Sequence, residues 1–169
     1  NNQNTNDFGK EIIPEAIKNH KTVSYPYEGY WTDIGNIDSF FEANLGLTDD
    51  IPKFDLYDKS KRIYTRARML PTTKVSGTTL NKTVVAEGSI ISAAKIEHSV
   101  IGIRSRIGDE STIINTYTMD SDFYQNLEFL RNTARAPIGI GARCFIKNAI
   151  LDVNCSIGDD VRINGGTHL

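Results

Sequence analysis

The stretch SVIGIRSRIGDESTI, residues 99–113, places Ile101, Ile107 and Ile113 six residues apart. Apolar residues recur every three to four positions on an amphipathic helix and every second position on a half-buried strand. A step of six fits neither pattern. It indicates a backbone that repeats its own path every six residues.

Aliphatic residues recur in the same way along most of residues 75–163, at intervals of five or six, except between Ile113 and Ile140. The series is Val75, Leu80, Val85, Ile91, Ile96, Ile101, Ile107 and Ile113, then Ile140, Ile146, Leu151, Ile157 and Ile163. Small or β-branched residues stand two positions before the aliphatics, and glycine follows several of them, where a turning backbone leaves little room for a side chain. The aliphatic residues and the small or β-branched residues share one period of five or six, which indicates a repeat.

Two segments of the chain also match each other. IEHSVIGIRSRIGDESTI, residues 96–113, overlays IKNAILDVNCSIGDDVRI, residues 146–163, at a constant offset of 50. Such self-similarity indicates a solenoid, and a hexapeptide period indicates a parallel β-helix, although accidental spacing in a β-sandwich is the alternative. Three steps close one triangular turn. The predicted internal columns are Val75, Ile91 and Ile107; Leu80, Ile96 and Ile113; and Val85 and Ile101.

The rest of the chain lacks this period. Residues 115–137 are polar and partly aromatic, and we expect them to leave the coil as a loop or hairpin. Before Val75 the pattern predicts a short helix over residues 10–19, an extended stretch over 23–27, and an irregular connector over 49–74. The fold class is therefore mainly β, preceded by mixed elements.

A second helix is predicted from Asn36, a residue type that caps helix starts, to a stop at Gly46. Its apolar face would hold Ile37, Phe40, Phe41 and Leu45. Just before it, GYWTDIG, residues 29–35, combines the single tryptophan of the chain, Trp31, with Asp33 between glycines. A carboxylate there can bind a hard cation such as Mg²⁺, or it can simply cap the turn.

Composition limits the class of function. The chain has 19 Lys and Arg against 21 Asp and Glu, so we expect no nucleic-acid partner. No apolar run approaches the roughly twenty residues that span a bilayer, so we expect no membrane insertion. Cys144 and Cys155 are too few for a disulfide scaffold and favour a reducing compartment. The chain starts at Asn1 without a signal peptide and stops at an uncapped coil, so we expect a longer parent.

The segments NDFGKEIIP, YEGYWTDIGNIDSFFEANLGL, DLYDKSKRIYTRARMLPTTKV, IEHSVIGIRSRI and PIGIGARCFIKNAILDVNCSIGDDVRI resemble, in this order, the C-terminal part of glucose-1-phosphate adenylyltransferase, or ADP-glucose pyrophosphorylase. The resemblance runs from Asp7 to about Ile163. It implies the α/β tail end of a nucleotidyltransferase domain at residues 1–48, a connector at 49–74, and a left-handed parallel β-helix at 75–169 with the insertion at 115–137.

In that family ATP and glucose 1-phosphate give pyrophosphate and the ADP-glucose used for glycogen or starch. The resemblance implies that Asp33 is a catalytic Mg²⁺ ligand and that Asp7, Phe8 and Trp31 lie on the glucose 1-phosphate side of the pocket. The glycine-rich loop, the triphosphate-binding basic residues and the second metal-binding aspartate would precede Asn1, so this chain alone is expected to be inactive. The enzyme would be cytoplasmic, or plastidic in a plant.

The resemblance also implies a homo- or heterotetramer with a phosphorylated effector. Lys147 matches a basic effector position, and Arg104 and Arg106 are weaker candidates. The alternative for all three is a solvated outward face of the solenoid, and it weighs more for the two arginines.

Three alternatives remain. One is a guanylyl- or uridylyltransferase of sugar phosphates, and another is a regulatory subunit that has lost catalysis. The third is a hexapeptide acyltransferase that uses His98.

Overall fold

The computed structural model describes residues 7–132 and 135–166 in two compact units, residues 1–30 and 31–169. In the first unit a π-helix, Phe8–Ile12, leads into α1, Ile13–Asn19, which confirms the expected helix. The stretch 23–27 contains no regular strand. Among the described residues, no helix is long and apolar enough to cross a membrane.

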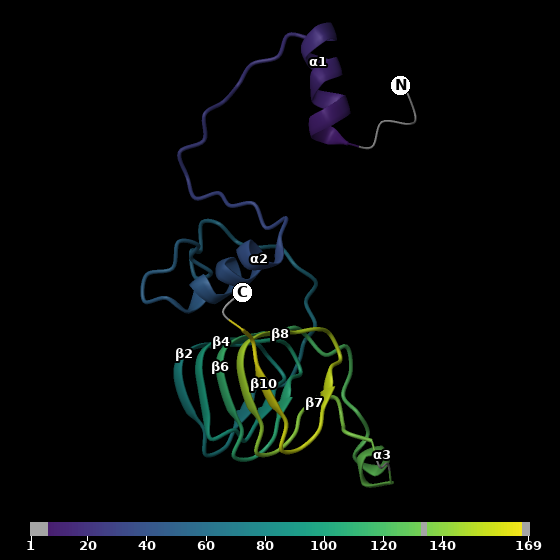
Figure 1. Ribbon diagram of the computed structural model, residues 1–169. Helices are drawn as coiled ribbons and strands as arrows, with labels where there is room; N and C mark the ends of the chain where they lie inside the picture. The colour runs from purple at the N-terminus through teal and green to yellow at the C-terminus, as the bar shows by residue number, and fades with distance from the viewer. Residues whose placement is uncertain (1–6, 133–134, 167–169) are drawn as a thin grey trace. The chain divides into compact units, whose positions relative to one another are not determined.

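The second unit contains a parallel β-helix made of two five-stranded sheets (Figure 1). One sheet has the short strands β1 (Lys74–Val75), β3 (Ile90–Ile91), β5 (Arg106–Ile107), β7 (Gly139–Ile140) and β9 (Ser156–Ile157). The other has β2 (Thr79–Val85), β4 (Lys95–Ile101), β6 (Thr112–Thr118), β8 (Phe145–Leu151) and β10 (Arg162–Asn164). Strands alternate between the sheets along the sequence, so each coil adds one strand to both.

The strand register confirms the predicted columns. Val75, Ile91 and Ile107 pair in succession in the first sheet, and Leu80 with Ile96 and Val85 with Ile101 in the second. The core isoleucines Ile91, Ile96, Ile101 and Ile113 are fully buried at 0% exposure. Each fully buried aliphatic side chain stabilises the fold by about 1.5 to 3 kcal/mol. This stack is therefore the main source of stability in the β-helix.

The long strands each bend around one corner of the triangle. At this corner Lys82, His98, Asn115 and Asn148 have φ between 43° and 51°, a left-handed conformation that Asn and His adopt more readily than most residues. His98 Nδ1 lies 2.8 Å from Asn115 Oδ1, and Asn115 Nδ2 donates to Asn148 Oδ1 at 2.7 Å. These contacts form a polar ladder between coils, in which His98 has a structural role through its contact with Asn115.

The small residues that precede the aliphatics link successive coils. Ser111 Oγ donates to the Gly141 carbonyl at 2.8 Å and accepts from the Cys144 amide at 3.0 Å. Ser89 makes the equivalent pair of bonds to Gly102 and Ser105 one corner away. A short hydroxyl fits this tight corner and satisfies backbone groups that the turn leaves buried.

The insertion starts later than expected. Residues 115–118, predicted to lie outside the coil, complete β6, because Asn115 occupies the corner position of His98 and Thr118 pairs with both Ile101 and Leu151. The polar side chains in this segment concealed the repeat. The excursion that follows carries α3, Leu127–Asn132, and the chain rejoins the coil at β7.

Helix α2, Ile37–Leu45, belongs to the same unit as the β-helix. Asn36 caps it as predicted, because its side chain accepts from the Ser39 amide at 2.8 Å. Phe41 and Leu45 are buried against Val100, whereas Ile37, at 65% exposure, lies outside this buried cluster. A short 3-10 turn, Gly46–Thr48, follows, and the connector up to β1 has neither helix nor strand.

Candidate functional site

The predicted metal-ligand residue lies in the loop before α2. Asp33 Oδ1 accepts a hydrogen bond from the Gly35 amide at 2.9 Å, so the carboxylate caps its own turn. A Cβ at Gly35 would lie 3.1 Å from that oxygen, a tight contact that the exposed carboxylate could relieve only by a small shift. Trp31, in the same loop, is 75% exposed. Both side chains therefore lie on an open surface of their unit.

The chemistry of Asp33 is compatible with Mg²⁺, which proteins often bind through one or two carboxylates together with substrate phosphates. The Gly35 amide engages Oδ1, and the described residues provide no hydrogen bond to Oδ2, which leaves one oxygen for a cation. Within the same described residues, no group of three or more His, Cys, Asp or Glu side chains could hold a metal. Asp33 thus fits a site completed by substrate and by other residues.

Asp7 and Phe8 belong to the other unit. The Asp7 side chain accepts from the Lys10 amide at 2.7 Å and caps the π-helix, so it has a local structural role. Phe8, the next residue, is exposed. The family resemblance implies that both residues contact the substrate, and that role stays a prediction.

An open groove of about 520 Å³ lies beside the N-terminus of α2. Its lining from the β-helix is Met119, Ile150 and Asp152, and its lining from the preceding loop and α2 is Ile34, Gly35, Asn36, Ile37 and Phe40. Its surface is mostly apolar. The groove adjoins Asp33 through Ile34, so the β-helix and the predicted ligand loop share one surface.

The three effector candidates lie on different parts of the coil. Lys147 is on β8, in the register column of Glu97, Ile114 and Asn164, and it makes no ion pair among the described residues. Arg106 is on β5 in the other sheet. Arg104 stands in the turn between the two sheets. The structure does not gather these cations into one cluster.

Arg104 already has partners in the insertion. Its Nη1 donates to the Ser121 carbonyl at 3.1 Å, and its guanidinium lies 5.8 Å from the ring centroid of Tyr124. Tyr124 in turn donates its hydroxyl to the Gly88 carbonyl at 2.7 Å. These contacts fasten the insertion across neighbouring coils. Tyr124 was not singled out from the sequence, since only the fold brings it to Gly88.

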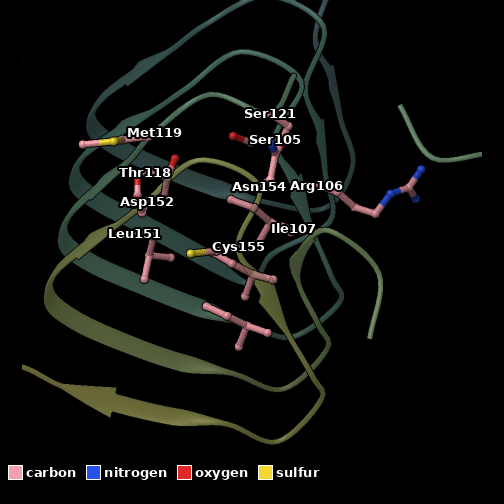
Figure 2. A pocket seen from close by; sticks show the side chains of 13 residues that line it. Ser105, Arg106, Ile107, Thr118, Met119, Ser121, Leu151, Asp152, Asn154 and Cys155 are labelled. Carbon is pink, nitrogen blue, oxygen red and sulfur yellow. The ribbon is translucent and has the colours of Figure 1, made fainter. Parts of the chain in front are cut away.

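A small cavity of about 30 Å³ lies where the insertion leaves the coil (Figure 2). Its lining includes Ser121, Asn154 and Cys155, and Figure 2 shows the Arg106 guanidinium directed away from it. This volume holds about one water molecule. A sugar phosphate or nucleotide does not fit in this cavity.

Comparison with known proteins yields matches over both parts of the chain. A family model described as the GLGC left-handed parallel beta-helix domain matches residues 68–169, and one described as nucleotidyl transferase matches residues 1–50. The first match confirms the left-handed β-helix fold class.

The chain is also 45% identical to the glucose-1-phosphate adenylyltransferase small subunit, chloroplastic/amyloplastic, of Triticum aestivum over 163 residues. The aligned region is 94% of this chain and 34% of that protein, so the chain spans about a third of the length of this relative. Because the β-helix match covers more than half of the residues, the chain belongs to the family of the GLGC left-handed parallel β-helix domain, that of glucose-1-phosphate adenylyltransferase.

Proposed function

We propose that this chain is the C-terminal part of an enzyme that forms ADP-glucose and pyrophosphate from ATP and glucose 1-phosphate for starch or glycogen synthesis. The observation that carries the proposal is the order of two matches in one chain, nucleotidyl transferase at residues 1–50 and the β-helix domain at 68–169. The 45% identity to an adenylyltransferase subunit supports the choice of base and sugar. A hexapeptide acyltransferase would leave the first match unexplained.

In this proposal Asp33 provides one carboxylate oxygen to the catalytic cation. Mg²⁺, when bound, neutralises charge on the reacting phosphates. The Gly35 amide fixes the other oxygen of Asp33, which limits the orientations of the carboxylate. Trp31, Asp7 and Phe8 would contact the glucose 1-phosphate side. The parts of the parent that bind the triphosphate would complete the site, so this chain alone would not catalyse the reaction.

The β-helix would serve assembly and regulation. We assign it a role in a homo- or heterotetramer, supported by the subunit name of the relative. Lys147 is the preferred contact for a phosphorylated effector, because its ammonium is unpaired among the described residues while Arg104 is engaged by the insertion. The chloroplastic/amyloplastic name of the relative supports a plastid location.

The test is the reaction of the complete enzyme with glucose 1-phosphate, Mg²⁺ and each nucleoside triphosphate in turn, with nucleotide sugar and pyrophosphate measured together. We expect ADP-glucose and pyrophosphate in equal amounts from ATP. Preferred use of GTP or UTP would identify another sugar-nucleotide pyrophosphorylase. No activity with any of the nucleoside triphosphates would favour a non-catalytic subunit.

A further inference from the structure

We propose that Tyr117, on the outer surface of the β-helix, is a positioning residue for Asp33 and acts on it through α2. The inference rests on the proposed function, because it assigns Asp33 a catalytic task. It concerns a residue that does not touch the reacting groups. Three successive contacts connect Tyr117 to the Asp33 loop.

The first contact is an apolar stripe on the outside of the coil. Val84, Val100, Tyr117 and Ile150 stand in one register column of the second sheet, on the face opposite to the core. Phe41 and Leu45 of α2 are buried against Val100, and the other three residues pack around them. A solenoid face exposed to water does not need four apolar residues in a column, so this stripe is built to receive α2.

The second contact is specific to Tyr117. Its ring packs edge-to-face with that of Phe40, with centroids 5.4 Å apart and planes at 76°, a geometry that aromatic pairs prefer. Burial raises the pKa of the Tyr117 hydroxyl above its ordinary value, and the nearby Asp120 carboxylate adds a smaller increase. The burial effect agrees with a ring that its neighbours largely cover. Phe40 lies in the first turn of α2. The pair therefore fixes the N-terminal end of the helix.

The third contact runs from this end of α2 to Asp33. Asn36 Oδ1 accepts from the Ser39 amide at 2.8 Å, and Asp33 Oδ1 accepts from the Gly35 amide at 2.9 Å. These two bonds hold residues 33–35 and 36–39, so few unrestrained backbone torsions separate Phe40 from the Asp33 carboxylate. A displacement of Phe40 on the stripe is passed on to Asp33, and a metal ligand displaced by about 1 Å can lower a rate roughly a hundredfold.

The experiment uses the complete enzyme with Tyr117→Ala and Tyr117→Phe, and with Ile157→Ala as the control. Ile157 is partly buried in the β-helix core and contacts the core cluster rather than the stripe. We expect Tyr117→Ala to need several-fold more Mg²⁺ for half-maximal rate and to lower kcat about tenfold or more. Tyr117→Phe, which keeps the ring, should restore both values, and Ile157→Ala should leave the Mg²⁺ dependence unchanged.

Amide hydrogen exchange of the metal-free enzyme gives a readout that does not involve catalysis. Tyr117→Ala should speed exchange in residues 33–45 while the β-helix strands keep their protection. If this variant does not fold, Phe40→Ala carries the same expectation from the other side of the pair. Faster exchange without a change in Mg²⁺ dependence, or no change in either, would overturn the positioning role. Loss of activity in Asp33→Asn alongside a normal Tyr117→Ala enzyme would refute this inference alone, whereas an unaffected Asp33→Asn enzyme would refute the metal assignment on which it rests.

Discussion

Ile107 pairs with Ile140 across one coil step although 33 residues separate them, whereas Ile91 pairs with Ile107 over 16 residues. The insertion between β6 and β7 therefore leaves and rejoins the coil at the same corner. If the residues of the insertion are left out of the sequence numbering, Ile91, Ile107 and Ile140 form an unbroken aliphatic column. The β-helix is thus continuous in space where the sequence period is interrupted.

Replacement of Ile107 by alanine tests this column directly. The side chain is 2% exposed between two aliphatic neighbours, so its truncation should lower the free energy of unfolding by about 2 to 5 kcal/mol. Val153, at 43% exposure, is the control, and Val153→Ala should change stability by less than about 0.5 kcal/mol. Chemical denaturation of both variants measures the difference. Equal stability of the two would contradict the column.

Gly108 tests the tight corner after the aliphatic. A Cβ at this position would lie 2.6 Å from backbone atoms of Gly141 in the next coil, and backbone atoms cannot swing aside. Gly108→Ala should therefore destabilise the protein by about 1 to 3 kcal/mol. Gly166 gives a matched control with little effect, because a Cβ added there would meet no atom of the described residues within 4 Å. Thermal unfolding that does not separate the two variants would show that the corner can relax.

The outer turns carry one ion pair with a defined pH dependence. Arg143 donates two hydrogen bonds of 2.7 Å to Asp160, and these bonds hold the pKa of the Asp160 carboxyl below its ordinary value. A lowered folded-state pKa gives stability that is present above the unfolded pKa of about 3.9 and is lost as the pH falls through the folded value. Parent and Asp160→Asn should differ slightly in urea midpoint at neutral pH. The two midpoints should converge as the pH falls below the lowered pKa of Asp160, and a gap that widens in acid would reverse the assignment.

Lys147 tests the effector proposal. It shares a register column with Glu97 and Ile114, so equivalent positions on three coils carry a negative, an apolar and a positive side chain. A compact ammonium binds phosphate, and only the third position offers one. In the complete enzyme, Lys147→Ala should raise the half-saturating concentration of inorganic phosphate or sugar phosphates and leave unregulated activity nearly unchanged. An unchanged titration curve would show that Lys147 is an ordinary solvated residue of the β-helix surface and does not bind the effector.

The interior of the β-helix could be predicted from the sequence because side chains that face the axis must repeat with the coil. Spacing alone predicts that Ile91, Ile101 and Ile107 face inward, and the structure buries all three. The sequence pattern places the start of the insertion too early, because Thr118 stands where the column of Ile101 would otherwise hold an aliphatic residue. A hydroxyl there is tolerated since it accepts from the Gly102 amide at 3.1 Å.

The site was less accessible to sequence reasoning. Asp33 could be singled out because glycines, a tryptophan and a helix cap surround it. Tyr117 and Phe40 could not be paired, because one residue belongs to a coil and the other to a helix more than seventy residues earlier. Only the packing of α2 on the outside of the sheet brings them together. Contacts of this kind depend on tertiary structure and have no local sequence period.

Asp33→Asn in the complete enzyme tests most directly whether this chain contributes to nucleotidyl transfer. The change removes the charge of a carboxylate while keeping its size, and Asp38→Asn, the same change in the first turn of α2, is the control. Initial rates of pyrophosphate release from ATP and glucose 1-phosphate should fall by about two orders of magnitude or more for Asp33→Asn and remain near the parent value for Asp38→Asn, with unfolding midpoints unchanged. An Asp33→Asn enzyme that releases pyrophosphate at the parent rate would contradict the account.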